Sequence, residues 1–200
     1  MAILGVLSFA GWITNRFFIN HNFHTVSPGT VYRSAQLDAT ALTKVIEQNG
    51  IKSILNLRGG HSSSGWYNAE TNAARQLGVR YYDYELSASE ELTDGQMNEL
   101  VTMIGNAPKP LLIHCKSGAD RTGLVGALYL YNFEGKSAEV ASEELTLLYG
   151  HVPYFFWHDT VAMDHSFSRY VAAHPSAHLS PKKHGSPLTR RETSTALMAN

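Results

Sequence analysis

One stretch of ten residues combines a nucleophile, a cation and a backbone pattern suited to binding an anion. Residues 114–123 read HCKSGADRTG, after an apolar run at residues 111–113 that predicts a buried strand. A stretch with the pattern of an apolar helix follows. Between a strand and a helix, loop N–H groups and the helix N-terminus can point at one bound anion. The segment therefore predicts a phosphate-binding loop.

Cys115 is the residue of this loop that can do covalent chemistry. The field that binds an anion at the base of such a loop also favours the thiolate, which is the reactive form. Gly118 lets the loop close without a Cβ clash, and Arg121 carries a planar fork that can pair two phosphate oxygens. The 200 residues contain one cysteine, which excludes an intramolecular disulfide framework and a cysteine-rich zinc site. A reactive thiol is the interpretation that its position favours.

The elements that must position this loop alternate along the chain. Strands are predicted at residues 30–33, 51–57, 79–86 and 111–113. Helices are predicted from Asp38 to Gly50, over 67–77, after Thr93, and over 122–133, 137–149 and 157–173. Such alternation implies an α/β fold with three αβα layers and a central, mostly parallel sheet. In these sheets the site lies at the carboxyl ends of the strands.

Charge is unevenly distributed between the body of the chain and its C-terminal end. The whole chain has a formal charge of -1; residues 174–200 hold four basic residues and one acidic residue, which leaves residues 1–173 at -4. The end segment is rich in Pro, Ser, Thr and His, and it predicts a disordered basic tail. No aromatic residues interleave with its basic pairs, so we expect no nucleic-acid partner.

The N-terminal residues 1–21 form a separate apolar segment. Its apolar run, residues 2–13, is shorter than the ~20 residues that cross a bilayer. No Lys or Arg precedes the run, which makes a complete signal peptide a poor match. Three interpretations stay open: a short or clipped membrane anchor, an amphipathic segment on a membrane surface, or an arm buried against the domain.

The loop string matches the signature Cys-x5-Arg-Ser/Thr-Gly, and the chain here resembles the cysteine-dependent protein tyrosine phosphatase superfamily. VYRSAQ (31–36) and ILNLRG (54–59) look like the small dual-specificity branch. NFHTVSPGTVYRSAQ (22–36) is similar to bacterial members, many of which carry an N-terminal membrane segment. The resemblance implies a protein tyrosine phosphatase-like domain at 22–173, attached to a bacterial cell envelope through residues 1–21 or free in the cytoplasm.

The resemblance also implies roles for the loop residues. Cys115 would attack phosphorus and form a cysteinyl-phosphate that water hydrolyses. Arg121 and the loop amides would stabilise the transition state, and Thr122 would assist the thiolate as leaving group. His114 would orient the loop and tune the cysteine. The substrate-binding loop would also include Lys116, Ser117, Gly118 and Ala119. This chemistry needs no metal or other cofactor, and the ten histidines show no metal-binding spacing.

The general acid is where the sequence departs from the family pattern. The family places an aspartate on a loop upstream of the cysteine, a region that here reads DYELSASEE at residues 83–91. Glu90, then Glu91, is the better placed loop carboxylate, although both also fit solvated charges before a helix. The second candidate is Asp120, since the form CxxGxDRT resembles lipid-active members such as the myotubularins. Repulsion from a bound phosphate would favour its protonated form, whereas its alternative role is a helix cap.

The expected activity is hydrolysis of phosphomonoesters on Tyr, Ser or Thr residues of proteins by a monomeric enzyme. Lys116 adds a cation at the loop rim and favours substrates with a second phosphate, which keeps a phosphoinositide phosphatase as an alternative. A catalytically weak phosphate-binding module is the rival from another class. Arg58 fits either the pocket rim or an exposed structural position, and Arg33 predicts an ion pair near the sheet edge.

Overall fold

The computed structural model describes residues 20–155 and 158–175. The predictions for the apolar N-terminal segment and for the basic tail therefore fall almost wholly on residues outside this part. Within it, none of the helices is both long and apolar enough to span a membrane. The elements are β1 (His24–Ser27), β2 (Val31–Ser34), α2 (Ala39–Asn49), β3 (Ser53–Asn56), α3 (Gly65–Gln76), β4 (Arg80–Asp83), α4 (Asp94–Asn106), β5 (Leu111–His114), α5 (Asp120–Phe133), α6 (Ala138–Ser142), η2 (Leu147–Tyr149), β6 (Tyr154–Phe155), β7 (His158–Asp159) and α7 (Val161–Ala173).

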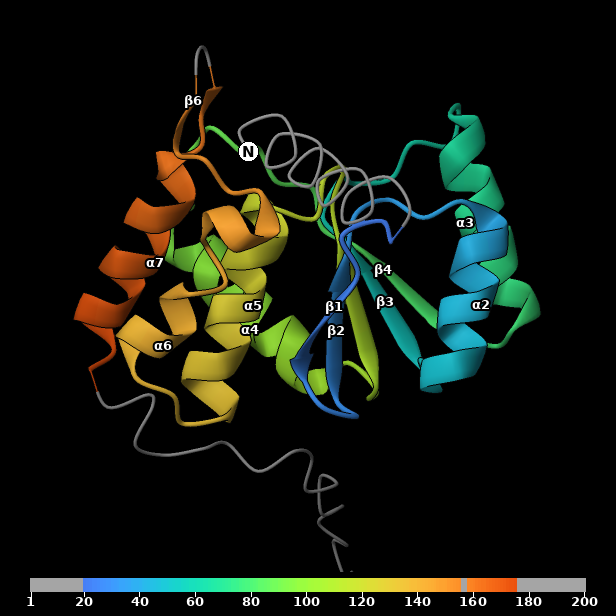
Figure 1. Cartoon of the computed structure of the whole chain (residues 1–200), viewed down its shortest axis with the longest axis horizontal. Coiled ribbons are helices and arrows are strands. Elements are labelled where there is room, and N and C mark those ends of the chain that lie inside the picture. Colours follow the sequence, from blue (N-terminus) through green and yellow to red (C-terminus); the bar gives the residue numbers. More distant parts are fainter. Residues whose placement is uncertain (1–19, 156–157, 176–200) are drawn as a thin grey trace, which may run out of the picture.

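The central sheet confirms the predicted α/β class. Its strand order is β1-β2-β5-β3-β4, in which β1 pairs antiparallel with β2 and all the other neighbours pair in parallel. Two helices, α2 and α3, cover one face, and α4 to α7 cover the other (Figure 1). The middle strand, β5, is buried along its whole length and leads into the 114–123 loop. The loop thus leaves the sheet at the carboxyl end of its middle strand.

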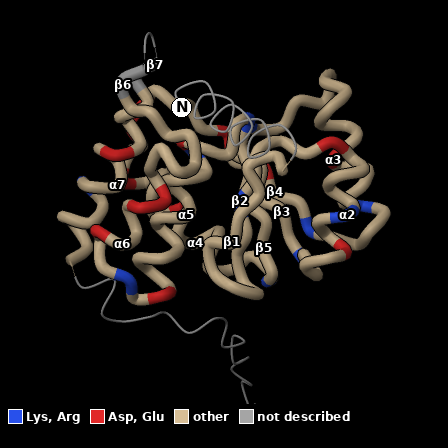
Figure 2. Tube along the Cα trace, viewed as in Figure 1, with Lys and Arg blue, Asp and Glu red and all other residues tan. Residues whose placement is uncertain are grey.

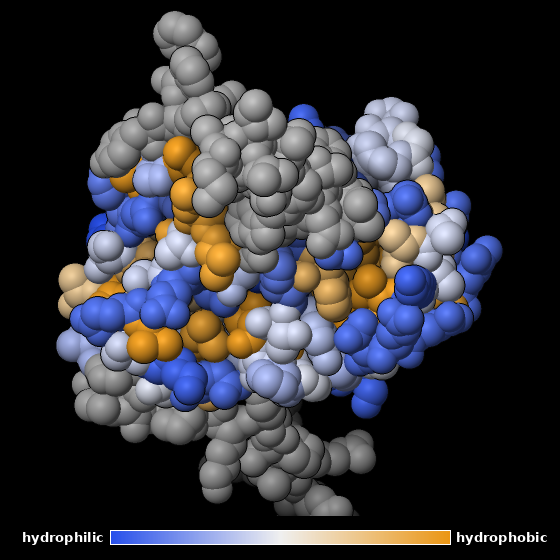
Figure 3. Space-filling view, viewed as in Figure 1, coloured by the Kyte–Doolittle hydropathy of each residue, from blue (hydrophilic) through white to orange (hydrophobic). Residues whose placement is uncertain are grey.

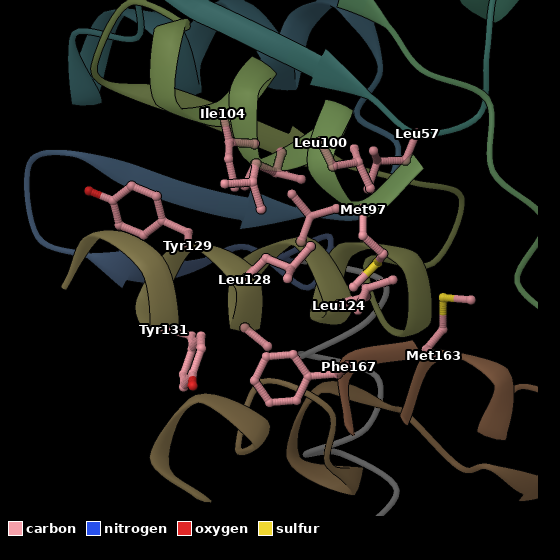
Figure 4. Close-up of a cluster of buried hydrophobic side chains, with 14 of the residues drawn as sticks. Leu57, Met97, Leu100, Ile104, Leu124, Leu128, Tyr129, Tyr131, Met163 and Phe167 are labelled. Carbon is pink, nitrogen blue, oxygen red and sulfur yellow. The ribbon is translucent and has the colours of Figure 1, made fainter. Parts of the chain in front are cut away.

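Each face of the sheet has its own apolar core. Successive side chains of a strand point to opposite faces, and Leu112 accordingly packs under α2 and α3 while Leu111 and Ile113 pack under α4 and α5. The larger core joins four helices to the sheet. Figure 4 shows this core, with labelled side chains from α4, α5 and α7 and the end of β3: Leu57, Met97, Leu100, Ile104, Leu124, Leu128, Tyr129, Tyr131, Met163 and Phe167.

Several helix boundaries confirm the caps that the sequence predicts. Asp38 accepts a hydrogen bond from the Ala41 N–H at the start of α2, and Gly50 ends this helix with φ +62°. Thr93 and Gln96 form a reciprocal capping box at the start of α4. These caps depend only on neighbouring residues, which is why the sequence alone predicts them.

Three elements differ from the prediction. The strand β1, which pairs with β2 across the turn at residues 28–29, is absent from the predicted elements. The helix predicted over 137–149 was wrong: α6 ends at Ser142, and Glu144, just beyond its end, turns inward and pairs with the buried Arg33. The helix predicted from residue 157 begins at Val161, after the β6–β7 hairpin. Two of the differences are short hairpins, β1–β2 and β6–β7, and the third lies beside a contact distant in sequence, that of Glu144 with Arg33.

The side of the molecule built from α5 to α7 carries both acidic residues and exposed apolar side chains. Figure 2 shows acidic residues along α6 and α7, in line with the acidic body that the sequence indicates. Figure 3 shows hydrophobic patches among hydrophilic ones on the visible face. The large apolar side chains that are exposed in or next to α6 and η2 are Val140, Leu147, Leu148 and Val152.

Candidate active site

Cys115 lies at the bottom of the loop between β5 and α5. Its side chain is buried, with the residue 1% exposed, and its Sγ accepts a hydrogen bond from the Gly118 N–H at 3.3 Å. α5 begins at Asp120, so its N-terminus faces the same loop. A backbone donor on sulfur and a helix N-terminus both stabilise negative charge, which is the environment that a thiolate nucleophile requires.

Four consecutive carbonyl groups of the loop point away from its centre. The Lys116 carbonyl accepts from the Gln36 N–H at 3.3 Å, and the Ser117 carbonyl accepts from Asn22 Nδ2 at 3.1 Å. Arg33 Nη2 donates to the carbonyls of Gly118 and Ala119 at 2.7 and 3.2 Å. In a trans peptide the N–H points opposite to the C=O. The N–H groups of residues 117–120 therefore face inward, as a cradle for an anion.

A glycine is required at position 118 both by the positive φ of the backbone and by the close approach of neighbouring backbone atoms. Its φ is +71°, and a Cβ at this position would lie 2.5 Å from the Ala35 N and 2.6 Å from the Ser34 carbonyl carbon. Both atoms belong to the backbone and cannot move aside cheaply. The VYRSAQ segment and the loop are thus in direct backbone contact, and the sequence prediction that glycine closes the loop is confirmed.

Arg33 is the buried support of the loop. Its side chain is 0% exposed, and it forms an ion pair with Glu144 in addition to its bonds to the loop carbonyls. The predicted ion pair is confirmed, one strand in from the edge of the sheet. Arg33 belongs to β2, which lies between β1 and β5. Buried polar donors are stabilised by acceptors, and the loop carbonyls serve Nη2 of Arg33, whereas its Nε has no hydrogen-bond partner among the described residues.

His114 is held by a carboxylate that the sequence analysis did not single out. Its Nε2 lies 2.8 Å from Glu70 Oε1, and both side chains are almost fully buried. Burial alone would raise the pKa of Glu70, but the charge and hydrogen bond of His114 and the bond from Gln36 outweigh it and lower that pKa. The ionised Glu70 thus holds the His114 ring directly before the nucleophile. The role of His114 in orienting the loop and tuning the cysteine stays a prediction.

The same carboxylate extends the network to Arg58. Gln36 Nε2 donates to Glu70 Oε2 at 2.6 Å, and Gln36 Oε1 accepts from Arg58 Nη1 at 3.0 Å. The Arg58 guanidinium also stacks 3.7 Å above the Trp66 ring. Partial burial and the nearby Arg121 lower the pKa of Arg58. Arg58 is thus half-buried near Arg121, and not the exposed structural arginine considered as its alternative.

Arg121 connects the loop to the ends of two neighbouring strands. Its Nη1 donates to the carbonyls of Leu57 and Leu86, at 3.2 and 3.0 Å. These residues follow β3 and β4 respectively, so the guanidinium spans the carboxyl ends of the sheet. Thr122 is 0% exposed, and among the described residues its hydroxyl has no hydrogen-bond partner. A buried hydroxyl that donates to no other described group can donate a hydrogen bond to the thiolate, as the predicted role of Thr122 requires.

Asp120 points to a histidine outside the loop. Its Oδ1 lies 2.7 Å from His151 Nδ1, and His151 Nε2 lies 2.8 Å from Asp164 Oδ2 on α7. Burial by itself lowers the pKa of His151, but the hydrogen bonds with Asp120 and Asp164 outweigh it and raise that pKa. Asp120 thus belongs to a row of three hydrogen-bonded side chains that leads out of the loop. The helix-cap role considered from sequence does not include such a row.

The upstream carboxylates occupy different environments. Glu90 is exposed on the loop between β4 and α4, and within the described residues it makes no hydrogen bond or ion pair. Glu91 pairs with Arg169 and His165 of α7, and the His165 hydrogen bond, with that of Arg169, lowers its pKa. Asp83 accepts hydrogen bonds from Asn56 and Tyr67. The structure brings Asp120 into the phosphate loop and leaves Glu90 without a described bond to it.

The residues that the sequence analysis missed share one property. They come from segments far away in the chain and contact either the loop or a residue that supports it: Asn22, Glu70, Glu144, His151 and Asp164. A signal exists for Glu70, which shares the buried face of α3 with Ala73 and Ala74 at helical spacing. A carboxylate on such a face requires a buried partner.

Comparison with known proteins agrees with this geometry. A family model described as "Swiss Army Knife protein, DSP-PTPase phosphatase domain" matches residues 20–161. A search of curated proteins gives no significant match. Among solved structures, TpbA of P. aeruginosa is 23% identical with a TM-score of 0.57, over 78% of this chain and 86% of that one.

Two further solved structures share the fold. Siw14 of S. cerevisiae, described as a PP-IP phosphatase, is 21% identical with a TM-score of 0.56, over 77% of this chain and 93% of that one. PTPMT1 is 14% identical with a TM-score of 0.56, over 77% and 99%. TpbA has been solved with phosphotyrosine and PTPMT1 with PI(5)P. The family model covers more than half of the chain, and the protein therefore belongs to the DSP-PTPase family of cysteine-based phosphatases.

Proposed function

We propose that this protein hydrolyses phosphomonoesters on phosphotyrosine, phosphoserine or phosphothreonine residues of proteins, through a cysteinyl-phosphate on Cys115. The observation that carries the proposal is the outward anchoring of the carbonyls of residues 116–119. Because these four groups are held from outside, the opposite N–H groups are preorganised around one point above the thiol. Preorganised donors of this kind stabilise developing charge without reorganisation during the reaction.

In the first step, the Cys115 thiolate attacks phosphorus, the S–P bond forms and the P–O bond to the leaving group breaks. The loop N–H groups and the Arg121 guanidinium bind the equatorial phosphate oxygens. Arg121 is suited to this because its contacts to Leu57 and Leu86 use Nη1, which leaves Nη2 for a second interaction. The leaving oxygen receives a proton from a carboxylic acid as the P–O bond breaks.

In the second step, water attacks the cysteinyl-phosphate, the P–O bond to water forms and the S–P bond breaks. The thiolate is the leaving group, and the Thr122 hydroxyl stabilises it by donating a hydrogen bond. The carboxylate that gave its proton in the first step accepts one from the attacking water. Protons therefore balance over the cycle, and the products are inorganic phosphate and the free alcohol or phenol.

Asp120 is the general acid that the structure favours over Glu90. Asp120 lies at the start of α5, in the loop itself, whereas Glu90 is on the exposed segment before α4. Replacing a general acid lowers the rate by roughly 10²- to 10⁴-fold. Asp120→Asn should show this loss together with loss of the falling limb of the pH–rate profile, while Glu90→Gln should keep both rate and limb.

A phosphoinositide substrate is the second candidate, and Arg58 favours it. This cation is held at the pocket rim by Gln36 and Trp66, near Arg121, and the exposed Lys116 adds a second positive charge. Two cations beside the phosphate cradle suit a substrate that carries an additional phosphate. The PI(5)P complex of PTPMT1 shows that a protein of this fold binds such a headgroup.

The decisive assay compares wild type with Cys115→Ser on phosphotyrosine peptides, phosphothreonine peptides and phosphoinositide micelles. Turnover of any of these that disappears in Cys115→Ser supports the phosphatase, and the preferred class identifies the substrate. Binding of phosphorylated ligands without turnover would instead identify a phosphate-binding module. Equal turnover by both proteins would contradict the role of Cys115.

Two further parts of the proposal depend on sequence alone. The apolar run at residues 2–13 supports attachment to a bacterial cell envelope, with the cytoplasm as the alternative location. A monomer is proposed as the functional state. Sedimentation of the full chain measures both. Without vesicles, a single species at monomer mass would agree with a monomer. With lipid vesicles, pelleting of the protein would agree with membrane attachment.

A further inference from the structure

A buried histidine joins the phosphate loop to the outside of the domain. His151 follows η2, and its side chain is 1% exposed. One ring nitrogen faces Asp120 in the loop, whose side chain is 19% exposed, and the other faces Asp164 of α7, whose side chain is 36% exposed. The helices α5 and α7 that carry the two carboxylates pack side by side (Figure 1). The three groups form a line from the loop to the surface.

Counting hydrogens shows that this line holds one proton that can be shared. Distances of 2.7 and 2.8 Å between nitrogen and oxygen each require a hydrogen between the two atoms. A neutral imidazole carries one N–H, so either the ring is an imidazolium between two carboxylates or one carboxyl group is protonated. Both arrangements have the same total charge and differ only in the position of one proton.

The backbone holds the ring in this position. The His151 N–H donates to the Thr146 carbonyl at 3.1 Å. Two carboxylates face the His151 ring, Asp120 from α5 and Asp164 from α7. The Arg33 guanidinium, which is paired with Glu144, lies over the ring of the nearby Tyr149. The side chain is therefore fixed between two carboxylates, on an element that also contacts the support of the loop.

We propose that His151 is a positioning residue that holds the Asp120 carboxyl group and shares with it the proton delivered to the leaving group, with Asp164 at the outer end. This inference rests on the proposed function. In the first step, Asp120 gives its proton to the leaving oxygen while neutral His151 keeps the N–H toward Asp164. In the second step, the proton released by the attacking water returns to the Asp120–His151 pair. No oxidant, metal or further reactant is involved.

Leaving groups of different basicity separate this role from a structural one. Phenyl phosphate needs protonation of its leaving oxygen, whereas 4-nitrophenyl phosphate needs it far less. His151→Gln should therefore lose about 10²-fold in kcat on phenyl phosphate and less than about tenfold on 4-nitrophenyl phosphate. Inhibition by vanadate should be unchanged, because the phosphate loop is intact. The control, His165→Gln, removes another histidine–carboxylate contact of α7 and should leave both rates unchanged.

A double-mutant cycle tests whether His151 acts through Asp120. If it does, adding His151→Gln to Asp120→Asn should cause no further loss on phenyl phosphate. Asp164→Asn, at a partly exposed position, is the variant least disruptive to folding. It removes one negative charge beside the imidazolium, so the falling limb of the pH–kcat profile should shift to lower pH.

The outcomes are distinct. Equal losses on both substrates, additive losses in the cycle, or an unshifted limb in Asp164→Asn would each overturn the role of His151 while the phosphatase itself stands. Absence of Cys115-dependent turnover in the wild type on both substrates would overturn the proposed function and this inference with it. A loss selective for phenyl phosphate, absent in His165→Gln, supports the proposal.

Discussion

Arg33 and Gly118 are 85 residues apart in the sequence, yet Nη2 of Arg33 donates to the Gly118 carbonyl at 2.7 Å. The same guanidinium binds the neighbouring Ala119 carbonyl and pairs with Glu144. One buried side chain therefore fixes the direction of two peptide groups in the loop. The shape of the cradle depends on this support as much as on the loop sequence.

Arg33→Lys should destabilise the fold and weaken anion binding together. Lysine keeps the charge but lacks the planar fork, so at least one buried carbonyl loses its donor, at a cost of about 1–3 kcal/mol. Urea unfolding measures the stability, and vanadate inhibition measures the cradle. Arg75→Lys is the control, because Arg75 is an exposed residue of α3 that contacts Asn72. Unchanged vanadate inhibition in Arg33→Lys would contradict the supporting role.

Gly118→Ala should abolish activity for steric reasons that Gly29→Ala lacks. Both glycines have a similar φ, +71° and +68°, so both substitutions carry backbone strain of roughly 1–3 kcal/mol. A Cβ on Gly118 meets backbone atoms at 2.5 Å, whereas nothing lies within 4 Å of a Cβ on Gly29. Measured kcat/KM should therefore fall only in Gly118→Ala. Similar activity in the two variants would show that the contact with Ala35 can relax.

Alkylation of Cys115 should be fast at neutral pH and should be blocked by vanadate or phosphate. The Gly118 N–H on Sγ and the N-terminus of α5 stabilise the thiolate, and an anion in the cradle covers it. Because the chain has one cysteine, intact-mass measurement after iodoacetamide reports this residue alone. Labelling that proceeds equally with and without vanadate would contradict the position of the thiol beneath the cradle.

Glu70→Gln should remove a pH-dependent part of the stability. Burial opposes ionisation of Glu70, but His114 and Gln36 outweigh it, so the folded pKa lies below the ordinary value of 4.5. The ionised group therefore stabilises the fold above pH 4.5, and this contribution is lost as the pH falls below that value. Urea unfolding between pH 7 and pH 3 should show a shallower decline for Glu70→Gln than for wild type. Glu47→Gln, on the exposed side of α2, should follow the wild type.

The parts of the site that the sequence predicts are those contained in one short segment. Cys115, Gly118 and Arg121 belong to a ten-residue string between a strand and a helix, and the distances between them follow from local geometry. The caps at Asp38 and Thr93 are likewise local. Such features depend on neighbours in the chain, so their residue types alone indicate them.

Contacts across the fold could not be predicted in the same way. The side chains of Arg33 and Glu144 come together only when β2 and the segment after α6 are packed, and Glu144 lies two residues beyond the end of α6. His151 meets Asp120 from 31 residues away, in a region that periodicity assigned to a helix and its end. The helix propensity of a short segment contributes less free energy than the pairing of a buried charge, so the pairing determines the structure where the two conflict.

The amide of Asn22 clamps the Ser117 carbonyl and the Tyr149 carbonyl together, across sequence separations of 95 and 127 residues. During synthesis from the N-terminus, Asn22 leaves the ribosome long before Tyr149 is added. Contacts of such separation form late, after the loops between them have closed. The nascent chain therefore carries its thiol and its signature sequence without a finished cradle, and the ability to bind phosphate is acquired only when almost the whole domain has been made.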